Sequence, residues 1–164
     1  MGTPDELAER LASALRLEPH PEGGRYRQLH RSETTVEVLG RGARRRAVTA
    51  ILFLLARGEV SRWHRVLSDE VWHFHEGDPL ELVVVDAAIG AVTRHLLGRA
   101  SEGLEPLAVV PAGAWQAARP TGELALVSCT VGPGFEFEDF ALLADVPHDA
   151  SRLGERFPDI AGLL

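Results

Sequence analysis

The chain has 164 residues, enough for one ordinary domain with a substantial buried core. Its 17 basic and 24 acidic residues give a formal net charge of −7, which argues against nucleic acid and anionic membranes as partners. The single cysteine, Cys129, excludes an intrachain disulfide framework and is expected to be a small buried side chain. No apolar run approaches the roughly 20 residues of a membrane-spanning helix. Residues 1–17 lack the apolar core of a signal peptide, so a cytoplasmic location is expected.

The first predicted element is a helix over residues 4–15. Thr3 is a suitable N-cap, Pro4 suits the first helical position, and Glu6 completes a Thr-x-x-Glu capping box. Four apolar residues recur on one helical face, which predicts that the helix packs against the domain: Leu7, Leu11, Ala14 and Leu15.

Short strands separated by turn signals follow the helix. About nine are expected, over residues 26–31, 47–56, 60–66, 70–75, 80–86, 91–97, 107–110, 124–131 and 135–142. Residues 37–46 are expected to form a charged loop. This pattern predicts an all-β sandwich or barrel over residues 24–143 rather than alternating strands and helices. A short helix over 150–157 lies in a C-terminal extension, residues 144–164, and the whole chain is expected to be one domain.

The most distinctive segment runs from Gly58 to Gly77 and contains His64, Val66 and Glu70. Alternate residues of a strand share a face, and the turn after Val66 brings Glu70 opposite His64. An imidazole and a carboxylate at one place suit a first-row divalent metal. Without a metal, the same pair is a general base with its orienting partner.

A second segment carries Pro111, Gly113 and Gln116. The two segments together resemble the two sequence motifs of the cupin superfamily, in which histidines stand at the positions of Val66 and Gln116. The resemblance implies a barrel mouth in which His64, Glu70 and Gln116 share one divalent ion. Such an ion would be weakly held, because Gln116 offers only an amide oxygen and Val66 offers no ligand.

The surrounding residues narrow the resemblance to one branch, the cupin-5 family, also called domain of unknown function 985. The segments that carry it are residues 21–26, 61–66, 69–77, 110–116 and 132–135. It implies a double-stranded β-helix (jelly roll), commonly a homodimer, akin in architecture to the sugar-nucleotide 3,5-epimerases. It implies no reaction, because one fold hosts many functions.

Further residues are candidates for the site. Tyr26, the only tyrosine, can supply a phenolic acid or base, and His73 can face the pocket. Strand parity places His73 and His75 on the face opposite Glu70, unless a bulge reverses it. Arg65 is expected to form a salt bridge or a dimer contact. Three tryptophans adjoin motif residues, either as core or as an aromatic wall for a flat or sugar-like ligand: Trp63, Trp72 and Trp115.

Three functions follow from these residues. The first is an isomerase or epimerase acting on a sugar, a sugar nucleotide or a carbonyl compound, with His64 and Glu70 in the proton transfer. The second is a non-catalytic module that binds a small molecule. The third, a metal-dependent oxygenase, is disfavoured because the site is poor in imidazole.

Overall fold

The structure is a computed structural model that describes residues 4–163. The helix α1 (Pro4–Leu15) has the predicted bounds, whereas the predicted N-cap Thr3 lies outside the described residues. No described helix is both long enough and apolar enough to cross a membrane.

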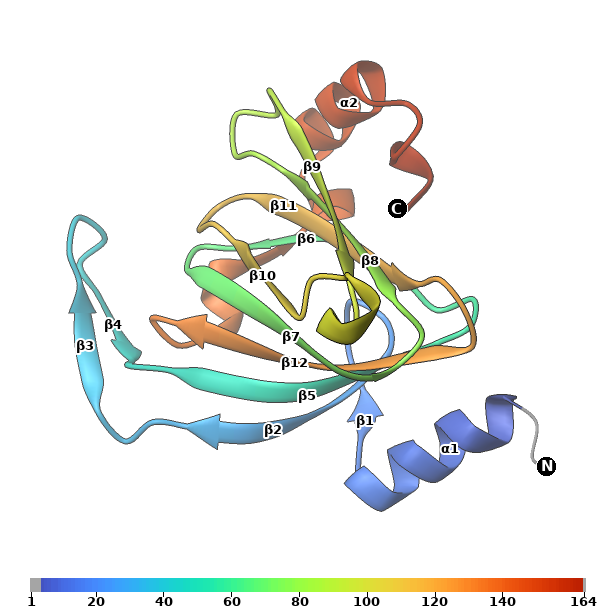
Figure 1. Cartoon of the computed structure of the whole chain (residues 1–164). Helices are drawn as coiled ribbons and strands as arrows, with labels where there is room; N and C mark the ends of the chain where they lie inside the picture. Colours follow the sequence, from blue (N-terminus) through green and yellow to red (C-terminus); the bar gives the residue numbers. More distant parts are fainter. Residues whose placement is uncertain (1–3, 164) are drawn as a thin grey trace.

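Two antiparallel sheets face each other and enclose the core (Figure 1). One contains β1 (Glu18–Pro19), β2 (Arg25–Arg31), β5 (Thr49–Ala56), β12 (Leu124–Gly132), β7 (Asp69–Gly77) and β10 (Leu107–Val110), in that order. The other contains β13 (Phe140–Leu142), β6 (Ser61–Val66), β11 (Trp115–Pro120), β8 (Leu80–Val85) and β9 (Val92–Leu97). The predicted all-β barrel is therefore confirmed.

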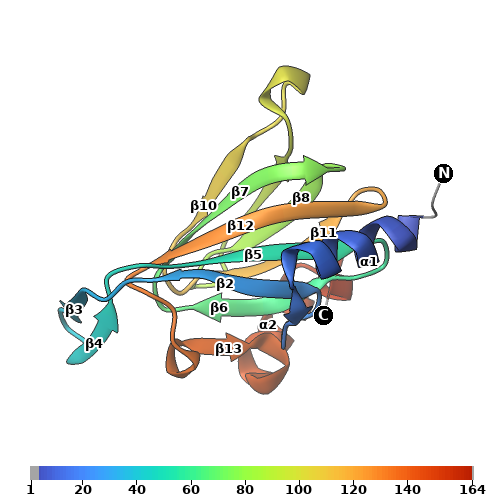
Figure 2. The same ribbon diagram turned by 90° about the horizontal axis from the view of Figure 1, so that it is seen from below.

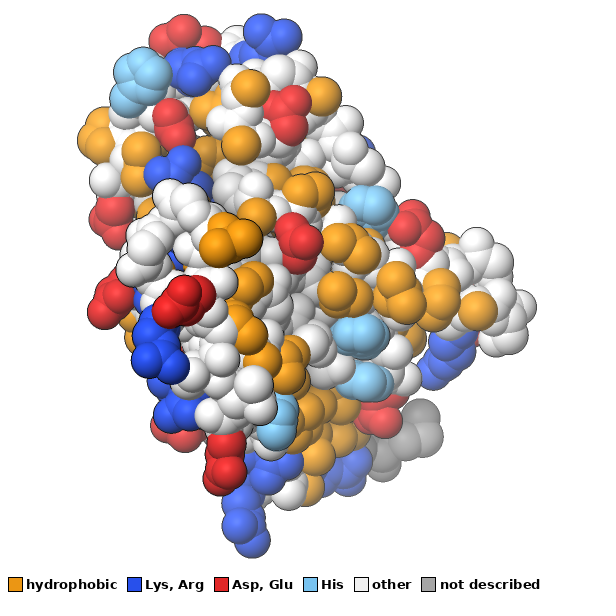
Figure 3. All heavy atoms as spheres, turned by 90° about the vertical axis from the view of Figure 1, so that its left-hand side faces the viewer, with side chains coloured by type: hydrophobic (Ala, Val, Ile, Leu, Met, Phe, Trp, Pro, Cys, Tyr) orange, Lys and Arg blue, Asp and Glu red, His pale blue; other side chains and the backbone are white. Residues whose placement is uncertain are grey.

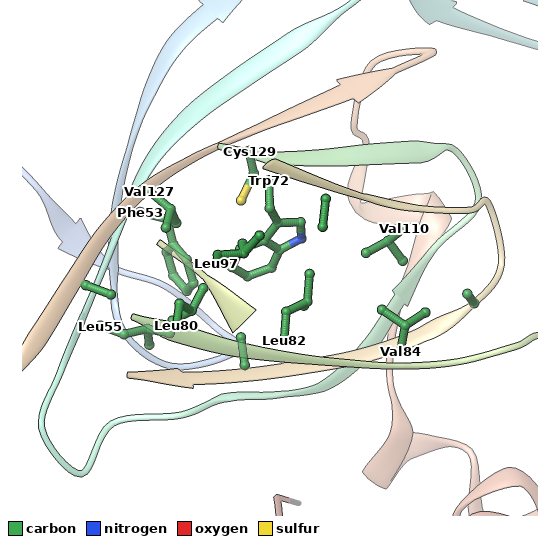
Figure 4. Close-up of a cluster of buried hydrophobic side chains, with 14 residues drawn as sticks. Phe53, Leu55, Trp72, Leu80, Leu82, Val84, Leu97, Val110, Val127 and Cys129 are labelled. Atoms are coloured by element: carbon green, nitrogen blue, oxygen red, sulfur yellow. The ribbon is translucent and has the colours of Figure 1, made fainter. Parts of the chain in front are cut away.

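The core between the sheets is built from the inward faces of both. Phe53 of β5 and Trp72 of β7 meet edge to face, with ring centroids 5.9 Å apart. Leu82 of β8 and Val127 of β12 pack in the same buried cluster (Figure 4). Each such apolar side chain contributes about 1.5–3 kcal/mol on full burial, so this layer holds the two sheets together.

The two helices cover the outer faces of the sheets. Ala8 and Ala12 of α1 pack against Leu54 of β5 and Leu126 of β12, and α1 lies along the strands of the six-stranded sheet (Figure 2). The helix α2 (Pro147–Arg156) supplies Leu153 to a cluster on the outer face of the other sheet. It begins three residues before the predicted start, because Pro147 is itself a good first helical residue.

Residues 37–46 are not the predicted loop. They belong mostly to a hairpin of β3 (Thr35–Val38) and β4 (Ala43–Arg46), which projects from the barrel in Figure 1. Gly40 and Gly42, at φ 79° and 60°, allow the tight reversal between these strands. Charged side chains of both signs are spread over this end of the molecule (Figure 3).

Two other strand predictions were wrong. The strand β11 was not recognised as a separate strand, because Trp-Gln-Ala-Ala-Arg-Pro has no clear alternation of apolar and polar residues. Residues 135–142 were predicted to be one strand, but only β13 (Phe140–Leu142) is extended, after the 3-10 turn η2 (Phe137–Asp139). That turn matters because residues 135–140 form one wall of the site.

Candidate active site in the barrel

A cavity of about 180 Å³ lies between the sheets. Its inner wall carries titratable side chains from several elements: His20, Glu22, Tyr26, His64, Glu70 and Cys129. Its other wall is mostly aromatic and comes from residues 135–140. Two predicted site residues, His64 and Glu70, thus line one cavity together with the predicted Tyr26.

His64 enters the cavity from β6 with one side of its ring already bound. Its Nδ1 lies 2.7 Å from the carbonyl oxygen of Arg62. A carbonyl only accepts hydrogen bonds, so Nδ1 carries the proton and Nε2 is the atom left for chemistry. Burial lowers the pKa of His64, while the Glu70 carboxyl and the Arg62 carbonyl act in the opposite direction.

The partner of that nitrogen is Glu22, which was not predicted as a site residue. Its Oε2 lies 3.3 Å from His64 Nε2, and its Oε1 accepts a hydrogen bond from Ser61 Oγ at 2.7 Å. Burial raises the pKa of Glu22, with His20, Ser61 and Arg62 opposing the shift. Glu22 and His64 therefore face each other with one proton to share.

The loop that carries Glu22 fits only because two glycines follow. A Cβ on Gly23, at φ 109°, would lie 2.2 Å from the carbonyl oxygen of Val60. A Cβ on Gly24 would lie 2.8 Å from the carbonyl oxygen of Leu54. The segment Pro21-Glu22-Gly23-Gly24 carries part of the family resemblance, and its carboxylate beside two glycines is the sequence signal for a site residue here.

His20 extends the same network. The backbone N–H of Glu22 donates to His20 Nδ1 at 3.2 Å, and the His20 ring meets Tyr26 edge to face at 4.6 Å. Burial lowers the pKa of His20, and the nearby Glu22 carboxyl opposes the shift. His20 was not predicted to be a site residue, because a histidine followed by a proline matches no functional sequence motif.

Glu70 is held from behind by a chain of hydrogen bonds. Trp72 Nε1 donates to Gln116 Oε1 at 2.8 Å, and Gln116 Nε2 donates to Glu70 Oε2 at 2.5 Å. The Cys129 thiol also bonds to Glu70. Burial raises the pKa of Glu70, and it raises that of Cys129 well above its usual value. Burial therefore favours the neutral form of both groups.

These hydrogen bonds argue against the prediction that Gln116 is a metal ligand. The indole N–H of Trp72 is a donor only, so the amide oxygen of Gln116 must face it and the amide nitrogen must face Glu70. Gln116 is also not among the residues that line the described cavity. Both of its polar side-chain atoms are engaged, one by Trp72 and the other by Glu70.

The donor set does not fit the weakly held divalent ion expected from the sequence. Within residues 4–163, no group of three or more His, Cys, Asp or Glu side chains is arranged to hold a metal. His64 Nε2 faces Glu22, and Gln116 turns its donor group toward Glu70.

The tryptophans do not form the proposed aromatic wall. Among the described residues that line the cavity, none is a tryptophan. Trp63 and Trp115 alternate with His64 and Gln116, so they point to the outer face, where their Nε1 atoms donate to Ile160 O and Asp149 Oδ2 at 3.3 Å each. The aromatic side chains of the cavity are instead Tyr26, Phe135, Phe137 and Phe140.

His73 does not line the described cavity either, because strand alternation turns it away from Glu70. A bulge does interrupt the pairing of β7 with β12, but only beyond Phe74. His75 contacts Ser128 Oγ at 2.8 Å. Arg65 lies over the Trp115 ring at 4.6 Å and pairs with Asp149 at 3.4 Å, as the salt-bridge prediction required.

Comparison with known proteins gives the chain relatives over nearly its whole length. A family model described as "Cupin superfamily (DUF985)" matches residues 9–143. A hypothetical protein from Leishmania major is 34% identical, with 95% of each chain covered and a TM-score of 0.81. A protein from Shewanella oneidensis is 36% identical, covering 89% of this chain and 94% of its own, with a TM-score of 0.73.

A more distant structure supports the fold alone. An uncharacterised Klebsiella pneumoniae protein with a double-stranded β-helix domain has a TM-score of 0.51 at 15% identity, over 87% of this chain and 95% of its own. No curated protein matches the chain.

Proposed function

Since this chain belongs to the DUF985 family of the cupin superfamily, whose fold alone selects no reaction, we propose from the site itself that it is a proton-transfer enzyme acting on a small carbonyl compound. Isomerisation and epimerisation are the reactions of this class. The observation that carries the proposal is the buried contact of 3.3 Å between His64 Nε2 and Glu22 Oε2 on the cavity wall.

The pair has the parts that a general acid–base catalyst needs. The Arg62 carbonyl orients the His64 ring, and Ser61 orients the Glu22 carboxyl. The shared proton stays on Glu22 during this step, and the lone pair of His64 Nε2 takes the proton from the carbon beside the carbonyl group. The electron pair of that C–H bond then forms the enediol double bond.

Glu70 lies on the same cavity wall, where burial favours its protonated form. Its proton goes to the carbonyl oxygen as the enediol forms, and Tyr26 is the other hydroxyl of the wall that can serve this role. Return of both protons, to another carbon or another face, completes an isomerisation or an epimerisation with all atoms balanced.

The size of the cavity limits the substrate. At about 180 Å³ it is smaller than the roughly 300–1,000 Å³ of pockets that enclose drug-sized ligands. A monosaccharide or a smaller carbonyl compound suits this space. A sugar nucleotide, the larger candidate from the sequence, would leave its nucleotide outside.

Non-catalytic binding of a small molecule is the second candidate. It is favoured by the wall of Phe135, Phe137 and Phe140, which offers contact area and no chemistry.

Solvent exchange separates the two functions. Small aldoses and ketoses are incubated with the protein in D₂O, and loss of the C–H signal beside the carbonyl group is followed by NMR. We expect exchange in the wild type and a loss of at least about 100-fold in His64→Gln, within the usual range for an acid–base residue. His148→Gln is the control, because its side chain is 80% exposed and is not among the described residues that line the cavity. Binding without exchange would support the binding module instead.

A further inference from the structure

The ionisable groups on the described cavity wall include more carboxyl groups than guanidinium groups. Its described residues include three carboxyl groups, those of Glu22, Glu70 and Glu136, and one guanidinium group, that of Arg31. Glu22 and Glu70 are buried, with 6% and 7% of their surface exposed. A small ligand held in the cavity would therefore lie against carboxyl groups that are largely buried.

The one guanidinium group is already neutralised. Arg31 Nη2 lies 2.6 Å from Glu136 Oε1, so its charge is balanced before any ligand enters. Arg62, whose charge opposes the rise in the pKa of Glu22, donates to the backbone oxygens of Pro21 and Glu22 and is not part of the described wall. Among its described lining residues, the cavity thus offers an anion no free positive partner, apart from histidines whose burial favours the neutral form.

Aromatic rings form the other wall of the cavity. Phe135, Phe137 and Phe140 meet edge to face, with centroids 5.1 to 6.2 Å apart, and Phe140 stacks on His64 at 5.6 Å. The face of such a ring attracts a cation within about 6 Å of its centroid. Buried carboxyl groups facing aromatic rings form a setting that favours an organic ammonium group over a neutral or anionic one.

We infer that the cavity selects small molecules that carry a positively charged amino group, such as an amino sugar or an amino ketone, and rejects anions such as phosphate esters. The inference rests on the proposed function in one respect, namely that the substrate has a carbonyl group. That the substrate also has an amino group is inferred from the ionisable and aromatic residues of the cavity wall. An ammonium group beside Glu70 favours the ionised carboxylate, so with such a substrate Tyr26, the other hydroxyl of the wall, gives the proton to the carbonyl oxygen.

Three probes of one shape test the charge preference: benzylamine, benzyl alcohol and benzoate. Binding at pH 7 is followed by protein NMR, in which the cavity residues report the site. We expect benzylamine to bind at least about 10-fold more tightly than benzyl alcohol, and benzoate to bind most weakly. Glu70→Gln should weaken the binding of benzylamine at least about 10-fold and change the binding of benzyl alcohol less than about 3-fold. Only the ammonium group of benzylamine interacts with the charge of the Glu70 carboxylate.

Glu136→Gln is the matched variant at the aromatic wall. It removes the partner of Arg31, so benzoate should bind more tightly than to the wild type. Benzoate binding to the wild type as tightly as benzylamine, or benzylamine leaving the cavity resonances unchanged, would overturn the inference. Since these measurements involve no turnover, the charge preference and the proton-transfer function can each fail while the other stands.

Discussion

Gln116 illustrates what a single buried side chain decides in this protein. It replaces a histidine of the cupin motif, and its two polar atoms bind Trp72 and Glu70. Since each atom of the amide has a fixed role as donor or acceptor, this residue orients the Glu70 carboxyl group. A histidine at position 116 would present one donor and one acceptor in a different geometry. The glutamine therefore alters the chemistry of the site and does more than weaken the binding of a metal ion.

The titration of Glu70 gives a prediction at the same scale. Its pKa in the folded protein is raised, mainly by burial, so the folded state holds this proton more tightly than the unfolded state. The resulting stability is present below the ordinary carboxyl pKa of about 4.3 and is lost as the pH rises through the raised value. Glu70→Gln has no such proton, so it should become more stable relative to the wild type as the pH rises from 5 to 8.

Urea unfolding of both proteins across that range measures the difference. Glu22→Gln should change in the same direction, because burial also raises the pKa of Glu22. A difference between wild type and Glu70→Gln that stays constant with pH would contradict the protonated state assigned to Glu70.

At the scale of elements, two connecting segments build the site. The loop over residues 20–24 brings His20 and Glu22 into a cavity lined mostly by strands. The turn η2 and its neighbours bring the phenylalanine wall, and Asp139 anchors them to the hairpin. Arg45 binds Asp139 through two hydrogen bonds, at 2.7 and 2.9 Å, which hold the pKa of Asp139 below its usual range. The hairpin thus supports the cavity without lining it.

Gly23→Ala tests the loop. The new Cβ would lie 2.2 Å from Val60 O at a φ of 109°, so the loop has to move and take Glu22 with it. We expect a loss of at least about 3 kcal/mol in the free energy of unfolding, together with loss of probe binding. Gly40→Ala is the control, since its φ of 79° is also positive but nothing lies within 4 Å of the added Cβ. The free energy of unfolding of Gly40→Ala should fall by only about 1 kcal/mol. Equal losses in both variants would show that the close contact with Val60 is unimportant.

At the scale of the whole molecule, the barrel leaves edges open. The strand β10 ends the six-stranded sheet and exposes Leu107 and Val109, each at 49%. Natural proteins pair or cover such edges. We therefore keep the homodimer expected from the sequence as a prediction. Sedimentation at micromolar concentration should give twice the chain mass of 17.8 kDa. A single species of the monomer mass would contradict it.

Much of the architecture was predictable because it depends on local patterns. Apolar periodicity located α1, and the short apolar runs located most strands and the facing sheets. The spacing of His64 and Glu70 placed both on one cavity wall, since strand parity and one turn connect them over few residues. Parity also predicted correctly that His73 faces away from Glu70.

The sequence by itself therefore determined the fold family, the two sheets and one half of the site. Only the tertiary structure decided which groups contact His64 and Glu70, the half of the site that the sequence predicted. Glu22 reaches His64 across 42 positions of the chain, and Trp72 reaches Gln116 across 44. Such contacts depend on how a glycine loop and a distant strand pack against the barrel, and no local pattern encodes the direction of a hydrogen bond between them. The same packing turned Trp63 and Trp115 outward and supplied the phenylalanine wall in their place.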